Sequence, residues 1–338
     1  MHEYRGVIHV HSTYSDGTGS IGRIVSAACR VRADFVILTD HNTMKAREDG
    51  HEGWHGGVLL LVGEEITPDT KADHYLAFDI ASTIKPSRDP AENIEAVQRQ
   101  GGIGIIAHPT GGAFVKGEYM EYPWTNWEAG LFGGIEVWNH VYDITGKAKN
   151  LLELALRVMF PWTAPCGPEQ GVLETWDYYV SDRGRRVVAI GGVDGHGILS
   201  DYEDDFATVS TYILTSDPFN GAFKHDSALV YGALREGRCF VGANKVADAS
   251  SFRCHVESGG ELVQMGGTAK LSRGAALAVS SPKPGLIRVI HDGRLLEERW
   301  GVSLETQLEQ RGAYRVEVRR KVCGRHMPWI FGNHISVA

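Results

Sequence analysis

Short apolar runs recur through the first two thirds of the chain, and each of them contains or precedes side chains that can bind metal ions. The runs cover residues 7–10, 35–39, 59–62, 103–107, 135–138 and 187–190. Runs of β-branched and aliphatic residues with little alternation are typical of strands buried on both faces, as in parallel sheets. The carboxyl ends of parallel barrel strands meet at one rim. We therefore expect the polar side chains at these strand ends to converge.

Patterns of helical spacing lie between the runs. One covers residues 21–28 behind Ser20, a suitable N-cap, and another covers 90–100, with Pro90 in its first turn. Two more helices are expected at 147–160 and 225–236, the second ending at Gly237, whereas Pro and Gly at 161–171 predict a loop. This alternation predicts βαβ units and an α/β fold.

The pattern changes beyond about residue 246. Short strands are expected at 252–256, 275–279, 286–291 and 314–319, separated by turn residues and by no helix of comparable quality. Two domains follow from this change: an α/β barrel over residues 1–245 and a small antiparallel β-sandwich-like module over 246–338.

Composition agrees with an ordinary globular protein of 338 residues. A formal net charge of −8, with both signs interspersed, disfavours binding of duplex nucleic acid through a broad basic face. No apolar stretch reaches membrane-spanning length and no signal-peptide core precedes the first strand, so we expect a cytoplasmic protein without membrane contact. The five cysteines are scattered, which predicts reduced thiols.

Two pairs of residues at strand ends have the spacing of metal ligands. His9 and His11 are two residues apart on a strand, so both imidazoles can reach one ion from the same face. Such a pair is about as often without function, but Asp16 follows on a polar loop just past the strand. Asp194 and His196 repeat the spacing among glycines that let the backbone approach an ion closely.

Two further strand ends carry carboxylates beside a candidate ligand. Asp40 precedes His41, and it either orients that imidazole or caps the following turn. Glu64 and Glu65 are adjacent, and only one of them can point inward from an extended chain.

Three single residues are weaker candidates. His108 closes a strongly hydrophobic run before Pro109, which ends the strand. His74 begins another strand-like run, and Glu136 lies within the run at 135–138. A lone histidine in such a position is more often structural than a ligand.

Two rival motifs can be set aside. Residues 51–55 match the zinc-peptidase pattern HExxH, but that pattern needs a helix, and the glycines around it would each cost a helix about 1 kcal/mol. Residues 102–107 match a dinucleotide-binding fingerprint, but their glycines enter a strand instead of opening a helix.

The segments HVHSTYSDGT (9–18), LTDHN (38–42), GEEIT (63–67), AHP (107–109) and GGVDGHG (191–197) occur in the order found in a known family. With them the chain resembles the polymerase and histidinol phosphatase (PHP) superfamily of metal-dependent phosphoesterases over roughly residues 5–245. The C-terminal part, with residues 328–333, is similar to the CehA/McbA-like metallohydrolase branch.

The resemblance implies a distorted (β/α)7 barrel that holds two or three divalent ions, usually zinc, manganese or iron. By motif, the first ion is held by His9, His11, Glu65 and Asp194, the second by Glu65, His74 and His108, and the third by Asp16, His41 and His196. Glu65 is the bridging ligand because the family motif places a carboxylate directly before the Ile-Thr pair. The chain departs from the family at Gly192-Val193, where a small Ser is common.

The activity implied is hydrolysis of phosphate esters, with phosphomonoesters of small metabolites or nucleotides as the expected substrates. A hydroxide that bridges two ions would be the nucleophile, because metal coordination lowers the pKa of water to about 7. Three divalent ions against three carboxylates leave a formal charge of roughly +3, which attracts a phosphate dianion. Catalytic roles fall to Asp16, Glu65 and His196, without an organic cofactor. Support of the ligands or contact with substrate is expected of Asp40, Glu136, Lys45 and Arg47.

Two other functions remain open: hydrolysis of a carboxylic or carbamic ester, and a non-catalytic metal-binding or interaction module. The C-terminal module could shield the barrel, bind carbohydrate or mediate oligomerisation. Substrate-lining residues are hardest to choose, and the candidates after the fourth and fifth runs are Lys116, Tyr119, Tyr122, Trp124, Trp127, Trp138, Asn139 and His140.

Overall fold

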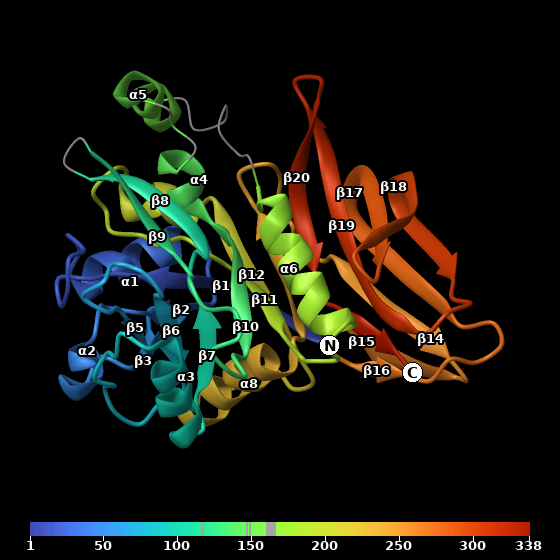
Figure 1. Ribbon diagram of the computed structural model, residues 1–338, viewed down its shortest axis with the longest axis horizontal. Helices are drawn as coiled ribbons and strands as arrows, with labels where there is room; N and C mark the ends of the chain where they lie inside the picture. The colour runs from blue at the N-terminus through green and yellow to red at the C-terminus, as the bar shows by residue number, and fades with distance from the viewer. Residues whose placement is uncertain (116–117, 147, 149, 160–166) are drawn as a thin grey trace.

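The computed structural model describes residues 1–115, 118–146, 148, 150–159 and 167–338. Figure 1 shows an α/β region, built from the first two thirds of the chain, beside a twisted β region built from the C-terminal strands. Among the described residues, no helix is long and apolar enough to cross a membrane.

A 14-stranded sheet runs through both regions. Its main path is β15 (Glu261–Gln264), β14 (Arg253–Ser258), β17 (Ala276–His291), β19 (Gly312–Val322), β20 (Arg325–Gly332), β13 (Cys239–Ala243), β12 (Val209–Thr215), β1 (His2–Val10), β2 (Phe35–Leu38), β4 (Val58–Val62) and β3 (Gly53–His55). Off this path, β18 (Arg294–Gln307) pairs with β17, and β21 (Ile335–Val337) pairs with β16 (Thr268–Ala269) and β19.

A five-stranded sheet completes the α/β region. Its order is β11 (Val188–Gly192), β10 (Gly134–Asn139), β7 (Ile103–Ile106), β6 (Tyr75–Phe78) and β5 (Glu64–Ile66). A separate hairpin pairs β8 (Thr110–Val115) with β9 (Glu118–Pro123).

The expected strands of the α/β region are present, and β2, β4, β7, β10 and β11 are buried along their whole length, as predicted. β1, β2 and β4 run parallel, and so do β7, β10 and β11. β6 differs, since it is antiparallel to β5 and β7. The connection from β5 to β6 spans only residues 67–74, and a parallel crossover needs a dozen or more residues.

Isolated bridges join the two sheets where the candidate ligands lie. Val10 at the end of β1 pairs with Gly195 beyond β11, and His41 beyond β2 pairs with Glu65 in β5. Backbone hydrogen bonds support both junctions, from His11 N to Gly195 O and from Asn42 N to Glu65 O, each at 3.0 Å. Closure at this end brings the carboxyl ends of β1, β2 and β11 to β5.

The helices are α1 (Ile21–Arg30), α2 (Lys45–Glu48), α3 (Pro90–Arg99), α4 (His140–Thr145), α5 (Leu151–Met159), α6 (Gln170–Ser181), α7 (Tyr202–Phe206) and α8 (Phe223–Glu236). The predictions at 21–28, 90–100 and 225–236 are confirmed by α1, α3 and α8, and Gly237 ends α8 in the left-handed conformation at φ 75°. α5 lies within the segment predicted at 147–160, whose residues 147, 149 and 160 are outside the described part, as are residues 161–166 of the predicted loop.

Helix α6 was not predicted. Its buried residues Val172, Leu173, Trp176 and Tyr179 have helical spacing, so the signal is present in the sequence. α6 lies between the two regions in Figure 1, and Asp177 on α6 binds Arg315 on β19 through two hydrogen bonds of 2.6 and 2.8 Å.

The C-terminal strands are antiparallel apart from the short β16–β21 pair, and they are longer than predicted. The strands expected at 275–279 and 286–291 form one continuous β17. β20 pairs with β13, with Val241 opposite Phe331, so the C-terminal region continues a sheet of the α/β region. The division into domains at 245/246 stays a prediction.

Candidate metal centre

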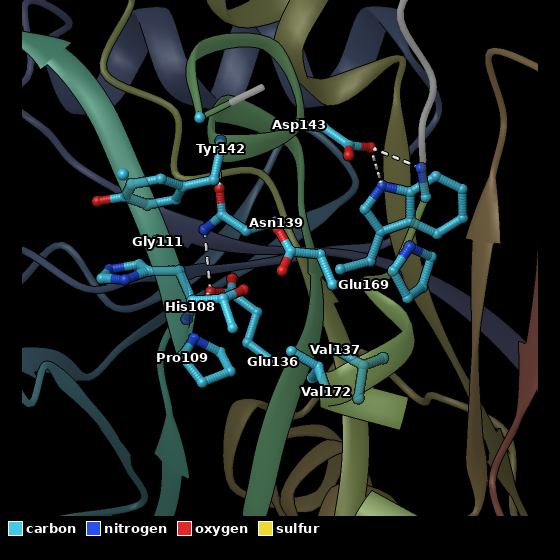
Figure 2. Close-up of a pocket in the computed structure, with 16 residues that line it drawn as sticks. His108, Pro109, Gly111, Glu136, Val137, Asn139, Tyr142, Asp143, Glu169 and Val172 are labelled. Atoms are coloured by element: carbon cyan, nitrogen blue, oxygen red, sulfur yellow. Dashed lines mark hydrogen bonds between the residues drawn. The ribbon is translucent and has the colours of Figure 1, made fainter. Parts of the chain in front are cut away.

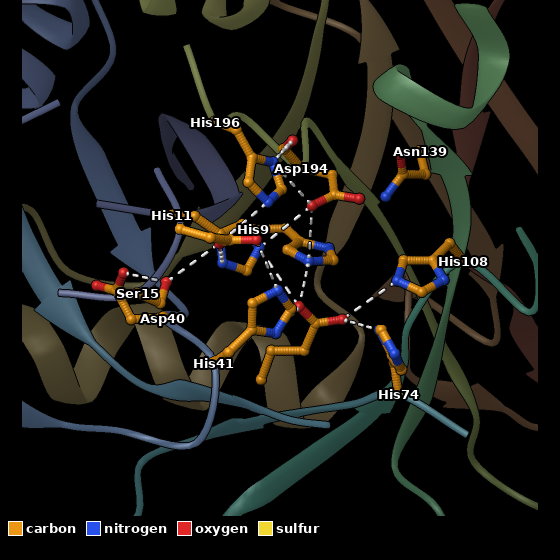
Figure 3. Close-up of polar contacts among 12 residues, drawn as sticks. His9, His11, Ser15, Asp40, His41, His74, His108, Asn139, Asp194 and His196 are labelled. Atoms are coloured by element: carbon orange, nitrogen blue, oxygen red, sulfur yellow. Dashed lines mark hydrogen bonds and ion pairs between the residues drawn. The ribbon is translucent and has the colours of Figure 1, made fainter. Parts of the chain in front are cut away.

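The polar residues at the strand ends gather into three groups that could hold metal ions. Within each group the ligand atoms all lie within 4.8 Å of one another. The groups are His9, His11, Glu65 and Asp194; Glu65, His74 and His108; and His11, Asp16, His41 and His196. Figure 3 shows these side chains converging from separate segments of the chain. Every ligand expected from the sequence is in at least one of the groups, and Glu65 and His11 are each in two of them.

The first group lies at the end of β1. His9 has a left-handed backbone, with φ 66°, and the register of β1 against β2 shifts between Ile8 and Val10. Nε2 of His9 lies 3.3 Å from both Glu65 Oε2 and Asp194 Oδ1, and Nε2 of His11 lies 3.3 and 3.2 Å from the same two atoms. Two imidazole nitrogens and two carboxylate oxygens therefore surround one point.

These separations fit a bound cation. Ligand atoms about 2.1 Å from a tetrahedral zinc ion lie roughly 3.4 Å from one another. Nε2 of both His9 and His11 is buried and has no hydrogen-bond partner in the described part of the chain. An unpaired buried nitrogen is costly, and an ion at the centre of the group would satisfy both nitrogens.

The second group shares Glu65 with the first. Oε1 of Glu65 lies 2.8 Å from His74 Nδ1 and 3.1 Å from His108 Nε2, while its other oxygen faces the first group. The neighbouring Glu64 points away from this group and accepts a hydrogen bond from Ile84 N at 2.7 Å. Glu65 is thus placed as a bridge between two groups.

The third group is more open than the other two, because the side chain of Asp16 is 56% exposed. Asp16 carboxylate oxygens lie 3.6 Å from His41 Nε2 and 3.3 Å from His196 Nε2. Nδ1 of His196 donates to Asp194 O at 2.8 Å, and Nδ1 of His41 lies 2.7 Å from Thr67 Oγ1. These contacts leave the Nε2 atoms of both histidines facing the group.

Asp40 supports the third group by a different route from the one expected. Its carboxylate accepts from Ser12 N at 2.8 Å, from Ser12 Oγ at 2.7 Å and from Ser15 Oγ at 2.7 Å. It therefore fixes the loop that carries Asp16, and no contact with the His41 ring is present among the described residues.

Glu136 lies directly behind two of the ligands and is 1% exposed. Its Oε1 accepts from His9 Nδ1 at 2.9 Å, and its Oε2 accepts from His108 N at 2.8 Å and Asn139 Nδ2 at 2.9 Å. A carboxylate in this position fixes the tautomer of a metal-binding imidazole. Gly192 is required beside it, since a Cβ there would lie 1.9 Å from Glu136 Oε1.

Carboxylates and imidazoles shift one another's pKa values. Burial would raise the pKa of Glu65, but His41 and His9 outweigh it and hold that pKa well below its usual range. Burial lowers the pKa of His11 to about 3, which keeps its ring neutral. Burial also opposes protonation of His196, but Asp16 and Asp194 outweigh it and raise its pKa to about 9. The centre thus keeps its carboxylates ionised and attracts positive charge.

A cavity of about 610 Å3 opens over all three groups. Beyond the candidate ligands it is lined by Thr67, Lys71, Tyr122, Val141, Tyr142, Thr145, Ile198, Leu199 and Asp205. Pockets of 300–1,000 Å3 are typical of sites for small molecules. The centre is therefore accessible to a substrate of that size.

The cations expected near the substrate lie elsewhere. Lys45 on α2 pairs with Asp49 at 2.8 Å, and Arg47 donates to Ile80 O at 2.6 Å and pairs with Glu52 at 3.0 Å. Neither of them lines the cavity, whereas Lys71, which the sequence did not single out, does. The course of the loop between β5 and β6 brings Lys71 to the cavity, and that course cannot be read from the sequence.

Of the expected substrate-lining residues, Tyr122 lines the large cavity. Trp138 and Asn139 line a smaller one of about 40 Å3 behind His108, shown in Figure 2. A space of that size holds no more than a few water molecules. Tyr119, Trp124, Trp127 and His140 line neither cavity, and Lys116 lies outside the described residues.

The rejected HExxH pattern does not form a site. Glu52 precedes β3, and none of residues 51–55 is helical. His55 Nε2 lies 2.7 Å from His51 O, and His51 Nε2 lies 3.1 Å from Tyr14 OH.

Fold and site together define a mixed α/β protein with a centre of histidines and carboxylates that could bind metal ions. No family model matches the chain. A stretch of 114 residues is 26% identical to the uncharacterized protein MJ1587 of Methanocaldococcus jannaschii, covering 30% of this chain and 66% of that protein. The match thus spans just under two thirds of that relative's length.

Three solved structures are similar to the chain. A two-domain protein from Bacteroides vulgatus, named for a PHP-like metal-dependent phosphoesterase, has 15% identity and a TM-score of 0.46, with 98% of this chain and 95% of that one covered. A Bifidobacterium adolescentis protein, named for metal-dependent phosphoesterase activity, has 17% identity and a TM-score of 0.38, covering 57% and 87%. A Chromobacterium violaceum amidohydrolase with bound sulfate has 14% identity and a TM-score of 0.32, covering 56% and 87%.

Proposed function

We propose that this protein is a metal-dependent phosphoesterase of the PHP type that hydrolyses phosphomonoesters of small molecules. The observation that carries the proposal is the position of Glu65, whose two oxygens face two adjoining groups of imidazole nitrogens. A carboxylate shared in this way can hold two cations a few ångströms apart, the arrangement used in many phosphatases.

The proposed ligands are the three groups described above, for two or three ions of zinc, manganese or iron, which accept mixed imidazole and carboxylate ligands. Bound ions would supply Lewis acidity and a water of lowered pKa. The same proposal includes closure of the α/β region into a (β/α)7 barrel and a sandwich-like module over residues 246–338.

The chain's own residues would prepare the site for an anionic substrate. Glu136 holds the His9 proton on Nδ1 and so directs Nε2 into the first group. The Asp194 carbonyl does the same for His196, which makes His196 a ligand in our proposal instead of a proton donor. Burial raises the pKa of Tyr142 well above its usual value, so its hydroxyl stays protonated and can donate to a phosphoryl oxygen.

Release of inorganic phosphate tests the proposal. Metal-loaded protein should hydrolyse p-nitrophenyl phosphate and other phosphomonoesters, and chelator or His9→Ala should abolish the activity. His2→Ala is a matched control, because His2 is exposed at the start of the same strand. Turnover of carboxylic or carbamic esters alone would overturn the proposal. Full metal occupancy without any turnover would favour a binding module.

A further inference from the structure

The cavity over the metal centre is lined by two unlike sets of side chains. One set consists of candidate ligands: Asp16, His41, Glu65, His74, His108, Asp194 and His196. The other set, here called the apolar wall, consists of Tyr122, Val141, Thr145, Ile198 and Leu199, and the lining is completed by Thr67, Lys71, Tyr142 and Asp205. These five wall residues come from β9, α4 and the loop that follows His196. A molecule bound with its phosphate at the ions would therefore place its other end against the apolar wall.

Two residues of the wall are exposed although they are large and apolar. Ile198 is 64% exposed and Leu199 is 40% exposed. Their loop is held in place: Thr18 Oγ1 donates to Gly197 O at 2.9 Å, and Tyr202 OH donates to His196 O at 2.9 Å. Apolar side chains fixed at the mouth of a cavity are typical of a surface that contacts a ligand.

The wall offers few hydrogen-bonding groups to a polar ligand. The hydroxyl of Thr145 already donates to Val141 O at 2.9 Å, and that of Tyr122 to Met120 Sδ at 3.7 Å. Lys71, on the loop before His74, is the lysine that lines this cavity among the described residues, and its Nζ lies 3.9 Å from Met120 Sδ. Hydroxyl groups of a sugar or polyol would lose water at the apolar wall without replacement.

We propose that the substrates are phosphomonoesters whose leaving group is an apolar body of about one ring, and that sugar and polyol phosphates are poor substrates. This inference rests on the proposed phosphoesterase function and names the substrate class of the same site. Val141, Ile198 and Leu199 would contact the apolar body, while its phosphate lies at the metal groups.

A matched pair of substrates tests the inference. Cyclohexylmethyl phosphate has nearly the shape of glucose 6-phosphate without its hydroxyl groups, and both release a primary alcohol. We expect kcat/KM to be roughly 100-fold higher for cyclohexylmethyl phosphate, the size of discrimination that an apolar pocket achieves. An equal or lower value than for glucose 6-phosphate would overturn the inference.

Variants of the wall connect the preference to these residues. Leu199→Asn and Ile198→Asn should each raise KM for cyclohexylmethyl phosphate by about 10-fold, the effect of one or two uncovered methylenes, with kcat nearly unchanged. Neither should change KM for glucose 6-phosphate. Leu262→Asn, at a residue 62% exposed on β15, is the matched control and should leave KM unchanged for both substrates. An unchanged substrate ratio in both wall variants would refute the role of the wall.

Hydrolysis of p-nitrophenyl phosphate distinguishes a failure of the proposed substrate class from a failure of the proposed phosphoesterase function. If that ester is hydrolysed while glucose 6-phosphate is preferred over its apolar counterpart, the phosphoesterase function holds and the substrate class is wrong. If the metal-loaded protein releases phosphate from none of the three esters, the function and the substrate class both fall.

Discussion

Replacement of Glu136 by glutamine removes one charge from behind the metal centre while keeping the size of the side chain. In the structure, the Glu136 carboxylate accepts hydrogen bonds from three donors: the His9 ring, the His108 backbone and the Asn139 amide. Glutamine offers one carbonyl oxygen and one amide group in the same space. The amide group of glutamine, which is itself a hydrogen-bond donor, must therefore point toward a group that donated to the carboxylate.

Both orientations of the new glutamine side chain are unfavourable. An amide toward His108 leaves a buried backbone N–H without a partner, because that backbone cannot turn away. An amide toward His9 moves the ring proton to Nε2, the atom that lies 3.3 Å from Glu65 and Asp194 and would bind the ion. Loss of a carboxylate behind a metal-bound histidine typically weakens metal binding by about 10- to 100-fold, or roughly 1.4–2.7 kcal/mol.

Competition with a chromophoric zinc chelator measures this effect. We expect Glu136→Gln to weaken the tightest site by that factor, while Glu95→Gln, at an exposed position on α3, should bind like the wild type. Thermal unfolding with excess chelator shows whether the variant is folded. A folded Glu136→Gln protein with wild-type zinc affinity would refute the role assigned to Glu136.

Three further predictions follow from single contacts. Gly192→Ala should weaken metal binding as Glu136→Gln does, because the new Cβ would lie 1.9 Å from the present position of Glu136 Oε1 and would displace that oxygen. A crystal structure of the variant with Glu136 unmoved would contradict this reasoning. Lys71→Met should raise KM for phosphomonoesters by about 10-fold with little change in kcat, as expected when one cation is lost from a phosphate site. An unchanged KM in steady-state kinetics would exclude a contact between Lys71 and the phosphate. Burial raises the pKa of Glu64 to about 7, above the value near 4.5 of an unfolded chain, so the folded form loses stability as pH rises from about 4.5 to 7. The side chain in Glu64→Gln cannot ionise, so the free energy of unfolding of this variant relative to the wild type should rise by about 3 kcal/mol between pH 4 and pH 8. If denaturant titrations give the same difference in free energy of unfolding at both pH values, Glu64 is not buried as a carboxylic acid.

The strands and the candidate ligands could be predicted because both depend on local sequence. A buried strand requires an apolar run, and residues just beyond such runs must lie at the strand ends, as His41 and His108 do. The choice of Glu65 over Glu64 came from the family motif, and the structure directs Glu65 to the imidazoles and Glu64 to Ile84 N.

Residues of the cavity could not be predicted in the same way. Lys71, Tyr142 and Leu199 belong to loops or a short helix whose positions depend on contacts far apart in sequence, such as Tyr202 with His11 and His196. Lys45 was chosen for its nearness in sequence to His41, but α2 turns its side chain toward Asp49. The antiparallel direction of β6 likewise follows from its short connection to β5 and not from its own residues.

A titration of metal-free protein with Mn²⁺, with bound ions and phosphate release measured at each step, tests the central claim most directly. Because Glu65 joins two adjoining groups, we expect phosphate release from p-nitrophenyl phosphate to appear only as a second equivalent of ion binds. Glu65→Gln should lose both the second equivalent and the activity. Full activity with one bound equivalent, or activity retained in Glu65→Gln, would contradict a multi-ion phosphoesterase built on this residue.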